Sequence, residues 1–116
     1  MPHRASVERL TDILQALERI RVYVDGLTFE EFCNDTRTVE AAQFNFIVIG
    51  EAARHIPDDV TEQHPEIPWP EMRGLRNVVA HGYFTVSLAI LWRTITDDLP
   101  PLVAPLQALV GEHRPG

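Results

Sequence analysis

The sequence has one cysteine, no long apolar run and few basic residues, and each shortage excludes a class of protein. Cys33 has no second cysteine in the chain to pair with, so the fold does not depend on an oxidising compartment. No stretch approaches the roughly 18 apolar residues of a membrane span, and the charged start, MPHRASVERLTDILQ, excludes a secretory signal. These features predict a soluble protein of the cytoplasm.

The shortage of positive charge limits how the chain can bind nucleic acid. Ten Lys and Arg against 17 Asp and Glu give a net charge of −7. Nonspecific affinity for nucleic acid comes mainly from basic side chains that neutralise phosphates, so any contact with RNA must be local. The acidic surface would suit a basic partner, although a solvated acidic surface with no partner is the simpler interpretation.

Several recurrent site patterns are also missing. The six glycines are dispersed, so no phosphate-binding loop is present, and no nucleophile elbow is found. Four of the histidines are scattered without zinc-ligand neighbours: His3, His55, His64 and His113. We therefore expect no metal and no cofactor. The length of 116 residues is that of one domain, and we expect residues 1–116 to form a single unit with its own core.

Apolar periodicity predicts helices through most of the chain. Residues 6–25 carry apolar side chains at three- and four-residue steps, with Ser6 as the N-cap and Gly26 as the stop. Thr28 and Glu31 have the spacing of a capping box, in which each side chain satisfies a free backbone N–H of the other. This box predicts a short second helix.

A third helix follows and carries two unusual features. Asp35 can cap it, and it must end before Pro57, because a proline disfavours helical geometry at the preceding residue. Gly50 costs ~1 kcal/mol relative to alanine inside a helix, so it predicts the close approach of another helix. Phe44 and Phe46 cannot both face one core well, which predicts that one of them meets a second subunit.

The remainder of the chain predicts two further helical segments. The proline-rich and acidic stretch 57–70 reads as a connector with one short helical turn, and a helix then runs from Pro70 towards Gly82. The segment 87–110 is periodic but contains three prolines, so we expect a kink or a break near 97–99 rather than one straight helix. No strand pattern is long enough for a sheet. The predicted fold is an all-α, up-and-down bundle of four to five helices.

The stretch RNVVAHGY, residues 76–83, gathers groups that can handle a phosphate and a proton. On a helix Arg73, Arg76 and Asn77 share one face, and Tyr83 returns to nearly the azimuth of Arg76. His81 lies about 140° round from Arg76, so it joins them only if the helix ends there or the arginine reaches across. The alternative is a solvated helix end with the histidine near the negative end of the dipole.

These side chains suit RNA cleavage without a metal. The 2′-hydroxyl must lose a proton, the leaving oxygen must gain one, and the phosphate charge must be stabilised. His81 can move a proton near neutral pH, and Arg76 presents a planar fork to phosphate oxygens. Asn77 could donate to the phosphate or orient His81, and Tyr83 could stack on a base or place its hydroxyl at the phosphate.

Carboxylates elsewhere offer supporting roles. Glu40 and Glu51, eleven residues apart on the third helix, share a face and could pair with arginines. A metal site built on these two carboxylates is the less favoured alternative. Asp97 and Asp98 are most simply surface charges.

RNVVAHGY matches the pattern R-x4-H-x-Y, and the chain resembles the HepT-like toxins, a branch of the HEPN superfamily of small helical ribonucleases. The resemblance extends to successive blocks in the right order: IGEAARHIP at 49–57, HPEIPWPEMRGLRNVVAHGYF at 64–84 and LWRTITDDLP at 91–100. It therefore covers nearly the whole chain.

The resemblance implies a homodimeric bundle in which two motif helices face each other across a cleft. It implies a metal-independent endoribonuclease, the toxin of a type VII toxin–antitoxin system, restrained by an MntA-type nucleotidyltransferase. By position, Arg76 and His81 match the catalytic pair, and Asn77 matches the polar residue that often follows the arginine. Tyr83 matches the tyrosine that the partner modifies with AMP. A two-fold axis would bring two copies of each group to one phosphate region.

The resemblance also offers supporting residues, and other functions remain open. Arg73 and Glu51 lie in matching blocks and are supporting candidates. The prolines at 101 and 105 depart from the family pattern and bear on partner contacts. The runner-up function is a non-catalytic HEPN module that binds a nucleotidyltransferase or a nucleotide. A third possibility is a purely structural helical dimer, in which His81 caps a helix and Tyr83 packs.

Overall fold

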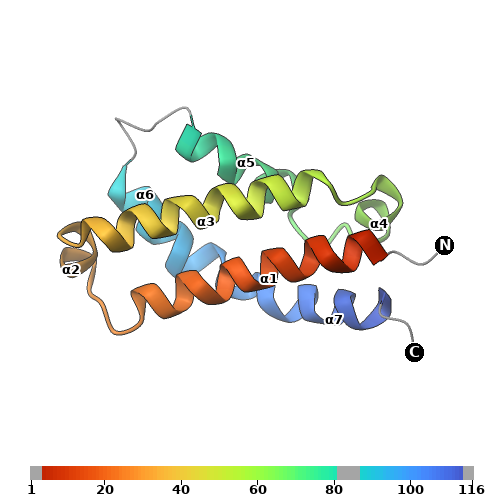
Figure 1. Ribbon diagram of the computed structural model, residues 1–116, viewed down its shortest axis with the longest axis horizontal. Coiled ribbons are helices and arrows are strands. Elements are labelled where there is room, and N and C mark those ends of the chain that lie inside the picture. The colour runs from red at the N-terminus through yellow and green to blue at the C-terminus, as the bar shows by residue number, and fades with distance from the viewer. Residues whose placement is uncertain (1–3, 81–86, 114–116) are drawn as a thin grey trace.

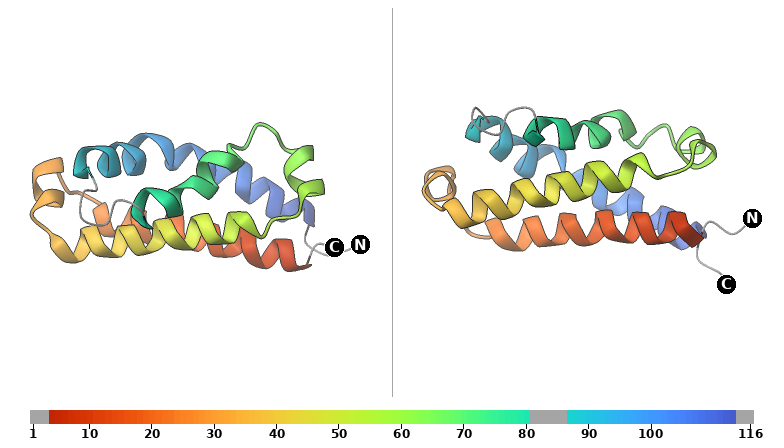
Figure 2. Two further views of the ribbon diagram at one scale, coloured as in Figure 1. Left: turned by 90° about the horizontal axis from the view of Figure 1, so that it is seen from above. Right: turned by 45° about the horizontal axis from the view of Figure 1, so that its top comes forward.

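The computed structural model describes residues 4–80 and 87–113, and within these ranges the chain is helical with no strand. In chain order the elements are α1 (Arg4–Val24), α2 (Phe29–Cys33), α3 (Thr36–Arg54), α4 (Asp58–Gln63), α5 (Trp69–Ala80), α6 (Leu88–Arg93), the π-helical turn η1 (Thr94–Asp98), the 3-10 turn η2 (Pro100–Leu102) and α7 (Val103–His113). The long helices run up and down, and α3 lies between α1 and α5 (Figure 1; Figure 2, right). The predicted all-α bundle is confirmed.

The first helix begins earlier than predicted. It starts at Arg4, so Ser6 lies inside its first turns and is 1% exposed, and the prediction that Ser6 is the N-cap is wrong. The Ser6 side chain is buried in the bundle, so it is not free to cap the helix end. The helix therefore begins two residues before the serine, at Arg4. The predicted stop is confirmed, since Gly26 follows the helix with φ 76°, a left-handed conformation that glycine adopts without strain.

Two side-chain caps fix the starts of α2 and α3. The Glu31 N–H donates to Thr28 Oγ1 over 3.1 Å, and the Thr28 N–H donates to Glu31 Oε1 over 2.9 Å, which confirms the capping box. Asp35 accepts from the backbone N–H and the hydroxyl of Thr38, as predicted for an N-cap. These hydrogen bonds from Thr38 hold the pKa of Asp35 below its ordinary value.

Helices α3 and α5 approach each other closely at Gly50. A Cβ atom at this glycine would lie 2.8 Å from both the Cβ and the backbone N of Arg76, and 3.1 Å from the carbonyl oxygen of Arg73. The close approach predicted from the sequence is therefore confirmed, and its partner is α5, the helix that carries Arg73, Arg76 and Asn77. This contact sets the distance between the two helices at the point where the candidate site lies.

The connector and the last segment also follow the sequence pattern. The connector forms α4, and α5 begins at Trp69, one residue before the predicted start at Pro70. The predicted end of this helix at Gly82 lies outside the described residues. The predicted break is confirmed, because the Leu99 N–H donates to the Thr94 carbonyl in a π-helical step just before Pro100.

Apolar side chains from the long helices and from the shorter segments between them fill the interior. The largest fully buried ones are Phe32, Phe46, Leu10, Ile13, Ile20, Ile49, Ile67, Met72, Leu91, Leu106, Leu109 and Val60. Phe46 is 0% exposed whereas Phe44, two residues earlier on α3, is 63% exposed, so only one of the two phenylalanines faces the core. No helix in the described ranges is long and apolar enough to span a membrane.

Candidate functional site

The structure places four of the predicted site residues on two packed helices. Glu51 lies near the end of α3, and Arg73, Arg76 and Asn77 lie on α5. The other two, His81 and Tyr83, fall outside the described residues. The assigned roles of all six residues remain predictions.

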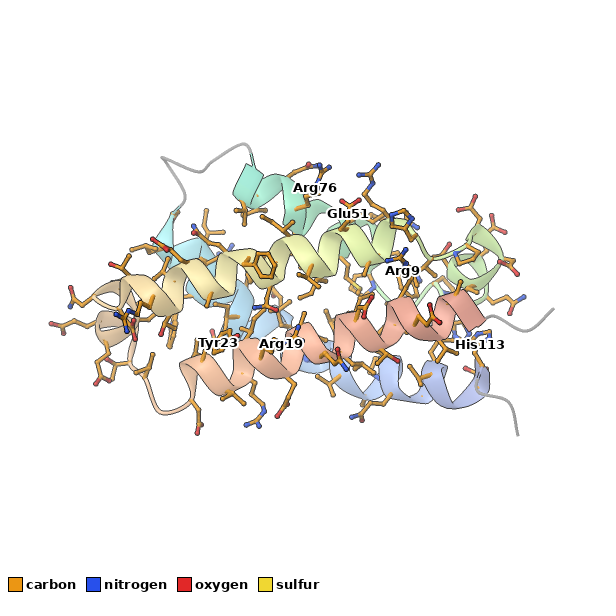
Figure 3. The ribbon with its side chains drawn as sticks, viewed as in Figure 1. Arg9, Arg19, Tyr23, Glu51, Arg76 and His113 are labelled. Atoms are coloured by element: carbon orange, nitrogen blue, oxygen red, sulfur yellow. The ribbon has the colours of Figure 1, made fainter. Side chains whose placement is uncertain are left out.

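Arg76 and Glu51 form an ion pair between the two helices. The Arg76 Nε lies 3.2 Å from Glu51 Oε2, and the side chains are 44% and 45% exposed. Figure 3 shows the two side chains on neighbouring helices and close to one another. The ion pair sits beside the Gly50 contact, which brings the α5 backbone at Arg76 against α3. The prediction that Glu51 pairs with an arginine is confirmed.

This pairing leaves the terminal nitrogens of Arg76 available. The guanidinium has five N–H donors in a planar fork, and its ion pair with Glu51, the one it makes within the described residues, uses only Nε. The Nη1 and Nη2 end of the group therefore keeps its donors for an anion. Glu51 thus fixes one edge of the arginine while the opposite end can meet a phosphate.

Glu51 also holds two cationic side chains that sequence reasoning did not single out. Arg54 Nη1 lies 3.5 Å from Glu51 Oε2, and His55 Nε2 lies 3.7 Å from Glu51 Oε1. His55 contributes a charge only when it is protonated. The signal was present in EAARH, residues 51–55, because positions three and four residues apart meet on a helix surface.

Arg73 and Asn77 are positioned less tightly. The Arg73 backbone packs against Gly50 and its side chain is half-buried, whereas Asn77 is exposed. Neither side chain has an ion pair or hydrogen bond within the described ranges. The Asn77 side chain can therefore change its rotamer to meet a ligand, because no hydrogen bond within the described residues holds it.

The two-carboxylate metal alternative does not fit the helix geometry. Glu40 and Glu51 share a face, but eleven residues of helix separate them by about 16 Å along the axis, too far to share one ion. Within the described part of the chain, no group of three or more His, Cys, Asp or Glu could hold a metal. Asp97 and Asp98 are exposed on η1, as predicted for surface charges.

Comparison with known protein families identifies the family of this chain. A family model described as "Ribonuclease HepT-like" matches residues 13–109, which include both sides of the Glu51–Arg76 pair. The chain belongs to the HepT-like ribonuclease family. The family match covers most of the bundle, so the predicted resemblance is confirmed.

Individual relatives of this HepT-like chain support the same conclusion. It is 38% identical over 106 residues, 91% of its own length and 96% of the relative's, to a "Probable ribonuclease HepT" of Thermococcus cleftensis. It is 32% identical over 105 residues, 90% of its length and 94% of the relative's, to a "Putative RNase" of Caldanaerobacter subterraneus subsp. tengcongensis. No solved structure matches the HepT-like chain significantly.

Proposed function

We propose that this HepT-like chain is a metal-independent endoribonuclease that cleaves RNA phosphodiesters. The observation that carries the proposal is the Arg76 guanidinium, fixed through Nε by Glu51 with its terminal nitrogens available for a phosphate. Arg76 precedes His81 by five residues, as in the family's R-x4-H pattern. The arginine stabilises charge on the crowded phosphate, and the histidine transfers a proton at the 2′-hydroxyl or at the leaving oxygen.

The test of this activity is incubation of RNA with the purified chain in excess EDTA. The chain must be produced without a neighbouring nucleotidyltransferase, so that it is unmodified. We expect cleavage that leaves a 2′,3′-cyclic phosphate, because the 2′-oxygen displaces the 5′-oxygen. An intact RNA substrate after incubation with unmodified protein would overturn the proposal.

We propose further that the chain acts as a homodimer through the outer face of α3 and α5. Phe44 on α3 is 63% exposed and Val78 on α5 is 41% exposed, and large apolar side chains left in water are stabilised when an interface covers them. Phe44 precedes Glu51 by seven residues, so the two share a face of α3. A two-fold axis across this face would bring two Arg76 side chains to one cleft.

Replacing Phe44 by arginine is expected to convert the dimer into a monomer and to abolish cleavage. The new charge would be desolvated in the interface, while the exposed position costs the folded monomer little. Sedimentation measures the mass, and thermal unfolding shows whether the fold survives. Val22→Arg is the matched control, since Val22 is 55% exposed on α1. A Phe44→Arg protein that stays dimeric and active would place the interface elsewhere.

We propose that an MntA-type nucleotidyltransferase antitoxin neutralises the chain by adding AMP to Tyr83, as in a type VII toxin–antitoxin system. The added phosphate carries negative charge and bulk two residues after His81, where an RNA phosphate would bind. Co-expression with the transferase is expected to raise the intact mass by one AMP and to suppress cleavage. An AMP-sized increment that persists in Tyr83→Phe would refute the assignment.

The second candidate is a HEPN module that binds a nucleotidyltransferase or a nucleotide and cuts nothing. The net charge of −7 favours it, because an acidic surface recruits RNA poorly. The EDTA experiment separates the two functions. Binding of a nucleotide or of the transferase by a chain that leaves RNA intact would support the module.

A further inference from the structure

We propose that Arg54, with His55 beside it, forms a second phosphate site that binds the phosphate neighbouring the scissile one. The inference rests on the proposed ribonuclease function and adds to it the substrate class: a strand with at least two consecutive phosphates. Neither residue belongs to the R-x4-H-x-Y pattern. The site is instead built at the end of α3, on the carboxylate that also holds Arg76.

The shared carboxylate brings the two arginine side chains close together. Arg54 Nη1 and Arg76 Nε both lie within 3.5 Å of the same oxygen, Glu51 Oε2. Their guanidinium groups are therefore adjacent but extend from different helices, α3 and α5. A strand whose scissile phosphate lies on Arg76 brings its next phosphate to Arg54.

The group formed by Arg54, Arg76 and Glu51 carries more positive than negative charge. Glu51 is the only carboxylate that pairs with Arg54 or Arg76 within the described residues, so the two arginines exceed it by one positive charge. Protonation of His55 adds a second. A local excess of cations on an acidic protein is what a small RNA contact requires.

The contact between Arg54 and Glu51 is weak enough to be exchanged for a phosphate. Its N–O distance is 3.5 Å, and the two side chains are 52% and 45% exposed. Exposed ion pairs of this kind contribute little to stability, and the contact occupies one of the five donors of Arg54. The other donors can bind a phosphate while Glu51 continues to hold Arg76.

Two substrates, one without and one with phosphates that flank the scissile one, test the second site. One is a dinucleoside monophosphate, which has the scissile phosphate alone; the other extends the same dinucleotide by one nucleotide at each end. We expect Arg54→Ala to lower the ratio of kcat/KM for the longer to the shorter substrate about tenfold. Arg76→Ala is expected to reduce cleavage of both substrates. The matched control is Arg37→Ala, an exposed arginine in the first turn of the same helix, which should keep the wild-type ratio.

A binding arm separates failure of this site from failure of the ribonuclease function. With a 2′-O-methyl RNA that cannot be cleaved, we expect Arg54→Ala to make the slope of log affinity against log salt shallower by about 0.7, the value for one lost phosphate contact on a single strand. If wild-type protein shows this Arg54-dependent slope but cleaves no RNA, the ribonuclease function fails, whereas the binding of a backbone phosphate by Arg54 is supported.

Three outcomes would overturn the second site. One is an equal loss of kcat/KM on both substrates, which would mean that Arg54 acts through Glu51 and Arg76. Another is a wild-type ratio and a wild-type salt slope in Arg54→Ala. The last is no binding of the uncleavable RNA by wild-type protein. Arg54→Gln, which keeps the length of a polar side chain, replaces Arg54→Ala if thermal unfolding shows that the alanine variant does not fold.

Discussion

Replacing Arg76 by alanine is expected to lower RNA cleavage at least about 100-fold, the usual effect of losing one group that stabilises transition-state charge. Lysine at the same position should restore little of it. An ammonium ion is a point charge without the planar fork, so it cannot bind Glu51 on one edge and a phosphate at the other end. The measurement is kcat/KM in EDTA, with His81→Ala examined in parallel.

Folding must be separated from chemistry in these variants. The Arg76 side chain is 44% exposed, so Arg76→Ala and Arg76→Lys should both leave the helical bundle intact, as measured by circular dichroism and thermal unfolding. Arg93→Lys is the matched control, an exposed arginine in the last turn of α6. Cleavage that persists in folded Arg76→Ala and His81→Ala proteins would move the active site away from this motif.

Replacing Gly50 by alanine is expected to destabilise the fold by about 1–3 kcal/mol, the range for an overpacked interior. The new methyl group would lie 2.8 Å from the backbone N of Arg76, an atom that moves only if α5 moves. Displacement of α5 would also carry Arg76 away from Glu51, so RNA cleavage should fall with stability. Urea unfolding measures the first effect and kcat/KM the second.

Gly74→Ala is the matched control, and it is expected to raise the stability of the fold rather than lower it. Gly74 lies within α5, and a Cβ atom there would meet nothing within 4 Å. Alanine should therefore stabilise the helix by about 0.5–1 kcal/mol through its propensity alone and leave cleavage unchanged. If Gly50→Ala were as stable as Gly74→Ala, the close contact between α3 and α5 would not limit the fold.

Predictions that depend on a few neighbouring residues were mostly confirmed. The Thr28–Glu31 capping box, the Asp35 cap and the break before Pro100 each depend on hydrogen bonds within three to five residues. Ser6 shows the limit of such reasoning. A serine suits an N-cap by type, but burial of its side chain in the bundle extends the helix past it.

Periodicity and residue type act over a few turns of chain, so they were enough to predict the helical segments, the need for a close neighbour at Gly50 and the chemical groups of the motif. That the neighbour of Gly50 is α5, and that Glu51 pairs with Arg76 on that other helix, became evident only in the folded bundle. It also decided that Phe44 faces outward and Phe46 inward. The reason is physical: which faces of two helices meet depends on the packing of the whole core, which no local pattern records.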